Sequence, residues 1–198
     1  MFNLHYINSN TPVYYPKIKP KDLNIASWAK LRKQKIDIFY NTIIGQNKKF
    51  EDSIRFYSIK EIFVDNKHFK KTKLYKNALI RIRNGYSIWN CKTEDELNAR
   101  FLYILPRLYE SIKKYGLLSQ EQLNNNASFL NDQLHHSNKR SINDDIMIGI
   151  NENSVYVFLD GSHRLAIAKI LGIHQIPVKI MFIHPHAINH KFSCDQEK

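Results

Sequence analysis

The residues of this sequence best suited to chemistry are the consecutive Asp160, Gly161, Ser162, His163 and Arg164. They stand between the apolar runs VYVFL and LAIAKIL, a pattern that predicts a strand turning directly into a helix. The N-terminus of a helix presents free backbone N–H groups and the positive end of the helix dipole, which together favour an anion. Arg164 adds a planar fork of donors that suits two phosphate oxygens, and Gly161 permits the close approach of a ligand. This group therefore predicts a phosphate-binding site.

The same residues allow a structural interpretation. Asp160 or Ser162 could cap the helix, and Arg164 could form a surface ion pair. The segment alone does not decide between the two interpretations, and both stay open at this point.

Two longer segments carry a resemblance to a known superfamily. The first conserved box of ParB-type N-terminal domains, a helix that ends in glycine before a hydrophobic pair and a glutamine, resembles residues 108–120, LYESIKKYGLLSQ. The second box, in which Gly-x-x-Arg opens a helix and Ile-Pro-Val enters a strand, resembles residues 160–180, DGSHRLAIAKILGIHQIPVKI. The two boxes occur in the family's order over about 80 of the 198 residues, with a longer gap between them. The chain thus resembles the ParB/sulfiredoxin superfamily.

The resemblance implies an α+β domain that has a small mixed sheet and a phosphate-binding helix, and it implies a nucleotide ligand, ATP, CTP or GTP. The residues implied to contact the phosphates are Gly161, Ser162, His163 and Arg164. Those implied to line the base side are Gly116, Leu117, Ser119 and Gln120.

The residues around the glycine distinguish the branches of this superfamily. Sulfiredoxins have a reactive cysteine where this chain has Ser162, and a hydroxyl is a much weaker nucleophile than a thiolate. Partition ParB proteins continue into a helix-turn-helix domain, for which the 26 residues after Gly172 of this 198-residue chain are too few. Free-serine kinases have an aspartate before the glycine, as Asp160 is here, although they carry a histidine in place of Ser162. The resemblance therefore implies a kinase that transfers phosphate to a hydroxyl of a small molecule or glycan.

In such a kinase Asp160 would be the general base or a ligand of Mg²⁺, and His163 would donate beside the phosphates. Glu110 is a candidate second acid/base or metal-coordinating carboxylate, or else a solvated side chain. His184 is a candidate contact to phosphate or substrate, and the HPHAINH segment it opens would suit a transition metal or an ordinary polar strand end.

Two functions other than a kinase have to be compared with the sequence. A non-catalytic ParB-like module that binds nucleotide or nucleic acid is the alternative. A nuclease would need paired carboxylates for its metal ions, and the sequence shows no such pair.

Periodicity and turn signals predict the elements around these residues. Thr93 and Glu96 form a capping box that opens a helix, which Pro106 interrupts and Gly116 ends. Its apolar face comprises Leu97, Phe101, Leu105 or Ile104, Leu108, Ile112 and Tyr115. The later elements are strands at Ile146–Ile150, Val155–Leu159 and Val178–Phe182, a helix at Ser162–Leu171, and a polar loop inserted at residues 124–143.

The N-terminal part is harder to assign. A helix is predicted at Ala26–Ile44, and a strand at Ala78–Arg83 before the turn signal Asn84-Gly85. The basic run HFKKTKLYK, residues 68–76, either surrounds buried aromatic rings or stacks bases. The expected organisation is a mostly helical, basic elaboration over residues 1–92, a nucleotide-binding domain over 93–186 and a polar tail over 187–198.

Charge is uneven along the chain. Residues 1–100 carry 20 Lys and Arg against 9 Asp and Glu, whereas residues 101–198 carry 10 against 9. A basic half suits nucleic acid, an anionic membrane surface or an anionic glycan acceptor, or it is simply a solvated face. The sequence shows no membrane span and no secretory signal, and its two cysteines are far apart, so free thiols in the cytoplasm are expected.

Overall fold

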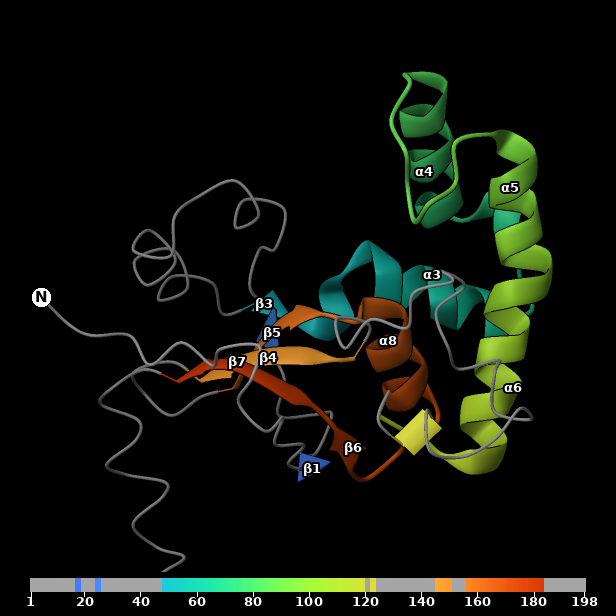
Figure 1. The fold of residues 1–198 in the computed structure, drawn as a ribbon. Coiled ribbons are helices and arrows are strands. Elements are labelled where there is room, and N and C mark those ends of the chain that lie inside the picture. The colour runs from blue at the N-terminus through green and yellow to red at the C-terminus, as the bar shows by residue number, and fades with distance from the viewer. Residues whose placement is uncertain are drawn as a thin grey trace, which may run out of the picture.

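The structure is a computed structural model that describes residues 17–18, 24–25, 48–119, 122–123, 145–150 and 156–183. It has the α+β architecture expected from the sequence, and Figure 1 shows the helices gathered on one side of the strands. The helix predicted at Ala26–Ile44, the inserted loop and the tail lie outside the described residues. Within those residues, no helix combines the length and the apolar character that crossing a bilayer requires.

The described strands form a mixed sheet in the order β3-β2-β5-β4-β7. Their bounds are Asn24–Ile25 for β2, Lys48–Lys49 for β3, Met147–Ile150 for β4, Tyr156–Asp160 for β5 and Lys179–Ile183 for β7. The two short apolar runs at Ile146–Ile150 and Val155–Leu159, joined by the turn signal Asn151-Glu152-Asn153, predict a hairpin. This is confirmed, because β4 and β5 pair antiparallel, while β7 runs parallel to β4 and β2 parallel to β5. A separate pair joins β1, Lys17–Ile18, to β6, Ile176–Pro177.

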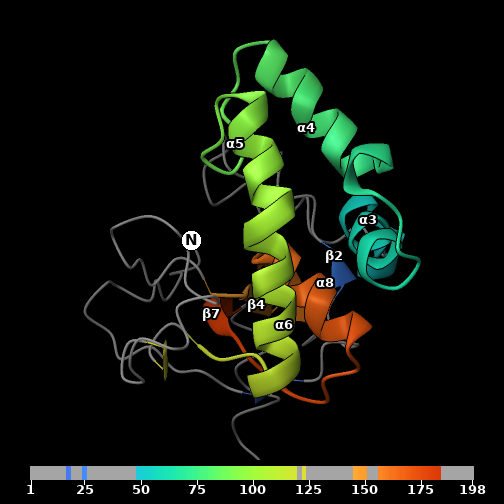
Figure 2. The ribbon, with the colours of Figure 1, turned by 90° about the vertical axis from the view of Figure 1, so that its right-hand side faces the viewer.

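Helix α8, Ser162–Ile170, follows β5 directly and matches the predicted helix closely. Leu165, Ala166, Ile167 and Ala168 are all fully buried, so this helix is covered on every side. Helix α3, Ile54–Phe63, and helix α6, Leu105–Tyr115, both pack against it. Figure 2 shows α6 lying across α8 in the view from that side.

The segment predicted as a strand at Ala78–Arg83 belongs to helix α4, Lys73–Arg83, so that prediction is wrong. The six letters ALIRIR alternate, but Leu74, Ala78 and Ile82 recur at helical spacing and all three are buried. The short 3₁₀ helices η2, Phe50–Asp52, and η3, Phe69–Lys71, precede α3 and α4 respectively.

The long helix predicted after Thr93 forms in three pieces. Its capping box is confirmed at α5, Glu94–Ala99, and Gly116 ends α6 with a φ of 74°. Between α5 and α6 lies η4, a π-helix at Arg100–Ile104, immediately before Pro106. Proline has no N–H for the carbonyl one turn earlier, so the expected interruption takes the form of this wider turn. One member of the predicted apolar face, Tyr115, is exposed.

A single hydrophobic cluster joins the N-terminal helices to the sheet and α8. It contains Ile59 of α3, Ile82 of α4, Ile112 of α6, Ile148 of β4 and Leu165 of α8. The expected boundary at residue 92 therefore passes through a shared core, and that domain division stays a prediction.

Candidate phosphate-binding site

The N-terminus of α8 begins where the sequence places it. β5 ends at Asp160, Gly161 takes the left-handed conformation with a φ of 87°, and α8 starts at Ser162. The first intrahelical bond runs from the Leu165 N–H to the Gly161 carbonyl, at 3.0 Å. The N–H groups of the first turn therefore lie outside the intrahelical ladder, as at any helix N-terminus.

Among the described residues, neither Asp160 nor Ser162 caps this helix with its side chain, as the structural interpretation would have required. The Asp160 Oδ1 instead accepts from the N–H of Gly161 at 2.8 Å. The Ser162 Oγ accepts from a guanidinium of α3, that of Arg55.

Gly161 lies so close to another part of the chain that no side chain would fit at this position. A Cβ at this position would lie 2.8 Å from the Ile146 Cα and 3.1 Å from the Asp145 carbonyl oxygen. The approach that the sequence suggested for a ligand is thus made by the chain just before β4.

Arg164 is buried and forms an ion pair rather than a surface contact. Its Nη1 lies 3.4 Å from the Asp145 Oδ1, and the two side chains are 9% and 2% exposed. Its Nη2 donates to the Leu118 carbonyl in the loop after α6. In place of the surface ion pair of the structural interpretation there is a buried link between α8, the chain just before β4 and that loop. The phosphate contact of Arg164 stays a prediction.

Arg55 is a member of the site that sequence reasoning missed. It lies 107 positions before Ser162 and donates to the Ser162 Oγ from the first turn of α3. Burial lowers the pKa of this guanidinium, the charge of Asp160 raises it and the charge of Arg100 lowers it further. Asp160 and Arg100 therefore both act on Arg55 through their charges.

Trp89 is the second residue of the site that sequence reasoning missed, and the guanidinium groups of two arginines lie over its ring. The Arg55 and Arg100 guanidinium carbons lie 5.5 Å and 5.7 Å from the centroid of its ring. The ring of His163 meets it edge-on at 4.9 Å between centroids. We call Arg55, Trp89, Arg100 and His163 the tryptophan cluster.

The backbone around Trp89 is a tight two-residue turn. Ile88 and Cys91 exchange backbone hydrogen bonds of 3.0 Å and 2.9 Å, and Trp89 and Asn90 both have positive φ, 52° and 65°. Left-handed backbone at a non-glycine residue costs about 1–3 kcal/mol and persists only where the surroundings impose it. This turn places the indole against α8.

The tryptophan cluster is rich in positive charge. Burial lowers the pKa of Arg100 as it does that of Arg55, and the Arg100 Nη1 reaches the Trp89 carbonyl at 3.5 Å. Two partly desolvated guanidinium groups close to one another repel, and burying them is costly without opposite charge nearby. The Asp160 carboxylate offsets part of this cost at Arg55, and an anion at the N-terminus of α8 would offset more of it.

The residues expected on the base side lie in the loop after α6. Leu117 is buried, and Gly116 provides the positive φ that ends the helix. Ser119 is also buried, and its Oγ accepts from the N–H of Gln122 at 3.1 Å, so it caps the next turn. Gln120 lies outside the described residues.

Of the other candidates, Glu110 is exposed on α6, and none of the described contacts joins it to the N-terminus of α8. His184 and the rest of the HPHAINH segment lie outside the described residues. Over the described ranges, no three His, Cys, Asp or Glu side chains come together as a metal site. Cys91 is a buried free thiol, and burial raises its pKa.

Comparisons of the chain with protein-family models, with curated protein sequences and with solved structures found no match.

Proposed function

We propose that this chain binds a nucleotide through its phosphates at the N-terminus of α8 and transfers a phosphoryl group to the hydroxyl of a small molecule or glycan. The observation that carries the proposal is the tryptophan cluster, where Arg55, Arg100 and His163 converge on one ring beside Ser162. The two guanidinium charges, set against the single carboxylate of Asp160, lie near a helix terminus that itself favours an anion.

The proposed fold is a ParB/sulfiredoxin-like domain with an N-terminal elaboration. The strand–glycine–helix unit at β5 and α8 supports it, as does the glycine-ended α6 that packs against α8. The elaboration supplies Arg55 and Trp89, so the proposed site combines both parts of the chain. We place the protein in a reducing cytoplasm, which suits the free thiol of Cys91.

Each residue has a distinct proposed role. Arg55 and Arg100 hold phosphate oxygens, and the N–H groups of the first turn of α8 complete the anion site. His163 donates beside them, while Arg164 positions α8 through its buried pair with Asp145. Asp160 accepts the proton of the attacking hydroxyl, and the nucleotide supplies the phosphoryl group.

Magnesium would be held largely by the nucleotide. Mg²⁺ is commonly bound through one or two carboxylates together with substrate phosphates. Asp160 is the carboxylate we propose beside the phosphates, since it ends β5 directly before the N-terminus of α8 and its charge acts on Arg55. The ion would neutralise charge on the phosphates.

A non-catalytic nucleotide-binding module is the second candidate. It is favoured by the contacts of Asp160, whose Oδ1 accepts from the Gly161 N–H and whose charge offsets that of Arg55. A purely structural carboxylate would make these contacts as well. Binding and turnover therefore have to be measured separately.

The experiment has a binding arm and a turnover arm. Calorimetry with ATP, CTP and GTP in Mg²⁺ compares wild type with Arg55→Gln, and Lys60→Gln, an exposed position on the same helix, is the matched control. Loss of a charge-assisted contact is worth about 1–3 kcal/mol, so Arg55→Gln should weaken binding roughly fivefold to a hundredfold. Unchanged affinity in a folded Arg55→Gln protein would remove the phosphate site.

The turnover arm uses Asp160→Asn. An asparagine oxygen can still accept from the Gly161 N–H, so the protein should fold, with a modestly lower melting temperature because Arg55 loses the opposite charge of Asp160. The rate of phosphate transfer to a panel of hydroxyl compounds should be about 10²–10⁴-fold lower than in wild type, which is the usual contribution of general acid–base catalysis. If Asp160→Asn remains fully active, or wild type transfers nothing while still binding nucleotide, the binding module is the correct function.

A further inference from the structure

We propose that the exposed face of α4 binds the phosphate backbone of double-stranded DNA. This surface is separate from the tryptophan cluster, and the inference does not depend on phosphate transfer. It is carried by the charge, the exposure and the anchoring of one helix.

All the Lys, Arg, Asp and Glu residues between positions 67 and 86 are basic, because the segment has seven Lys and Arg and no Asp or Glu. Lys67 and Arg83 at its two ends are paired, with Glu61 and Glu94 respectively. The other five side chains are exposed, and within the described part of the chain none of them has an ion-pair partner. They are Lys70 and Lys71 of η3, directly before α4, and Lys73, Lys76 and Arg81 of α4 itself, and we call all five the α4 cations.

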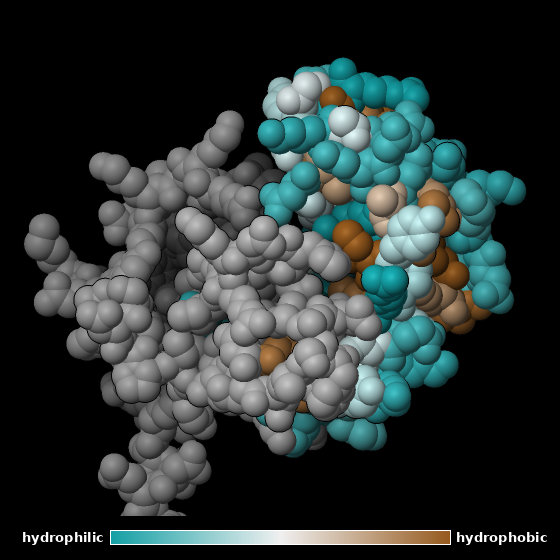
Figure 3. Space-filling model, turned by 45° about the vertical axis from the view of Figure 1, so that its right-hand side comes forward, coloured by the Kyte–Doolittle hydropathy of each residue, from teal (hydrophilic) through white to brown (hydrophobic). Residues whose placement is uncertain are grey.

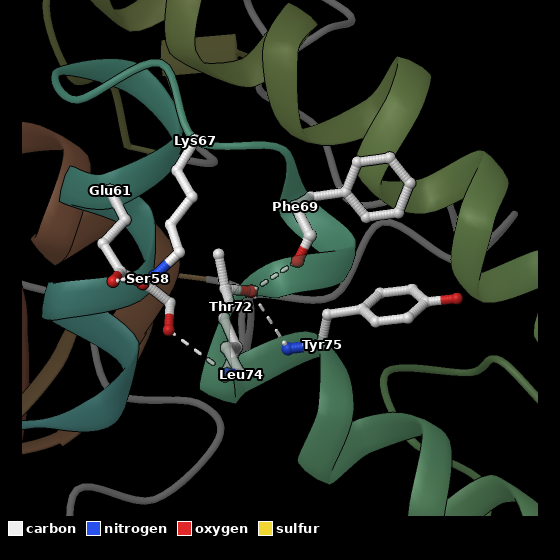
Figure 4. Close-up of polar contacts among 7 residues, drawn as sticks. All are labelled: Ser58, Glu61, Lys67, Phe69, Thr72, Leu74 and Tyr75. Carbon is white, nitrogen blue, oxygen red and sulfur yellow. Dashed lines mark hydrogen bonds and ion pairs between the residues drawn. The ribbon is translucent and has the colours of Figure 1, made fainter.

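The α4 cations stand on a firmly held support. Thr72 caps α4, accepting from the Tyr75 N–H at 3.3 Å and donating to the Phe69 carbonyl at 2.7 Å, and the N–H of Leu74 reaches the Ser58 Oγ of α3 at 3.2 Å (Figure 4). On the far side the Tyr75 hydroxyl donates to Asn98 of α5 at 2.7 Å. The buried face of α4 is thus fixed to two other helices, and the opposite face is left to carry charge.

The shape of this face suits a duplex. Figures 1 and 2 place α4 at the end of the molecule away from the strands, and Figure 3 shows a largely hydrophilic surface at that end. An 11-residue helix is about 16 Å long and, with its side chains, about 10–12 Å across, which matches the roughly 12 Å width of the major groove of B-DNA. The deep, narrow major groove of A-form RNA does not admit such a helix.

Single-stranded nucleic acid fits this surface less well. Proteins that bind single strands usually stack bases on exposed aromatic rings. The aromatic residues between the α4 cations are buried, since Phe69 is 6% and Tyr75 2% exposed, and both pack on Phe101. Phe69 and Tyr75 are therefore not available for base stacking. At the end of the segment Tyr86 is exposed, but the Arg81 guanidinium lies over its ring, 5.7 Å from the centroid.

An anionic membrane surface also fits less well. A helix that lies in a membrane interface inserts an apolar face. The apolar face of α4 is already buried in the protein through Leu74, Ala78 and Ile82. On the exposed face of the helix, Ile80 is the one large apolar side chain.

The test is fluorescence anisotropy of the full-length chain with a short, labelled DNA duplex of mixed sequence, over a series of salt concentrations. Wild type is compared with a triple variant, Lys73→Gln, Lys76→Gln and Arg81→Gln. The matched control removes the same charge at exposed positions of α3 and α6, through Lys60→Gln, Arg107→Gln and Lys113→Gln.

Wild type should bind at low salt, and the α4 variant should bind at least about tenfold more weakly at about 0.1 M salt. Each phosphate contact contributes about 0.9 to the slope of log affinity against log salt, so the slope should fall by about 2.7 for three lost contacts. The control variant should keep nearly the wild-type affinity and slope. Nucleotide affinity, measured in parallel, should be the same in all three proteins, so failure here and failure of the nucleotide site are distinguishable.

Three results would overturn the proposal. The first is that wild type does not bind duplex at low salt. The second is an equal loss in the α4 and control variants, which would assign binding to net charge alone. The third is tighter binding through the α4 cations to single-stranded DNA, or to vesicles containing phosphatidylserine, than to the duplex.

Discussion

Gly161 has two independent physical reasons to be glycine. Its φ of 87° is disfavoured for any residue with a Cβ, and a Cβ would lie within 2.8 Å of the Ile146 backbone. Gly172 shares the first reason, with a φ of 65°, but nothing lies within 4 Å of the place where its Cβ would be. Comparing alanine substitutions at the two glycines therefore distinguishes the effect of backbone strain from the effect of steric conflict.

We expect Gly161→Ala to lower the free energy of unfolding by about 2–5 kcal/mol, because strain and overpacking act together. Gly172→Ala, with strain alone, should cost about 1–2 kcal/mol. Urea denaturation of the two variants beside wild type measures both values. Equal losses would mean that the chain just before β4 moves aside for the extra methyl group, and the close packing of Gly161 would then not contribute to stability.

At the residue scale the sequence identified the right segment but could not identify its partners. The contacts of Arg164 lie with Asp145 and Leu118, and the partner of Ser162 lies on α3. No local pattern connects positions 107 residues apart. Trp89 offers one signal in hindsight, because a large aromatic residue in a turn followed by asparagine requires a tertiary reason to be there.

Elements with one dominant periodicity were predicted well, and those with two possible periods were not. The β4–β5 hairpin and α8 have continuous apolar runs bounded by turn residues, and both are confirmed. ALIRIR satisfies both period 2 and period 3.6, and the cap at Thr72, which lies outside those six letters, decides for a helix. The segment RFYSIKEIFV, residues 55–64, mixes aromatic and β-branched residues, so its sequence does not identify one element, and it lies largely within α3.

The capping box of α5 provides a test at this scale. The Thr93 Oγ1 accepts from the Glu96 N–H at 3.2 Å, and Glu96 accepts from the N–H groups of Lys92 and Thr93 at 2.5 Å and 3.2 Å. Thr93→Ala should lower the free energy of unfolding at pH 7 by about 1 kcal/mol, whereas Thr93→Ser should retain most of it. A Thr93→Ala protein as stable as wild type would show that solvent replaces the cap at no cost.

The same box should depend on pH. The backbone hydrogen bonds from Lys92 and Thr93 lower the pKa of Glu96, so the folded state favours the ionised carboxylate. Its contribution is fully present above the ordinary glutamate pKa of about 4.3, and it is lost as pH falls through the lower folded value. The stability difference between wild type and Glu96→Gln should therefore shrink on acidification, which denaturation at pH 7 and at pH values below 4 would measure.

At the scale of the whole molecule, charge and core divide the chain differently. Most of the net charge lies in residues 1–100, as composition indicates, which suggests an appendage to a neutral domain. The buried residues indicate a single folded unit. The ring centroids of Phe50 and Phe158 of β5 are 5.2 Å apart, and those of the stacked rings of Phe63 and Tyr109 of α6 are 4.1 Å apart. Charge is a property of the surface and does not reveal which apolar residues meet.

The shared core leads to a prediction about a fragment that begins at residue 93, the expected start of the nucleotide-binding domain. The fragment lacks α3, including Ile59, which is fully buried, and it lacks the turn that carries Trp89. Without α3, the side of α8 that α3 covers would be exposed to water. Each large apolar side chain exposed in this way would lose about 1.5–3 kcal/mol of stabilisation from burial. A domain typically has only about 5–15 kcal/mol of stability, so the fragment should not fold cooperatively. Thermal unfolding followed by circular dichroism should show one cooperative transition for the full chain and none for the fragment. A cooperative transition in the fragment, with nucleotide binding retained, would instead establish residues 93–186 as an independent domain and make Arg55 and Trp89 dispensable for the site.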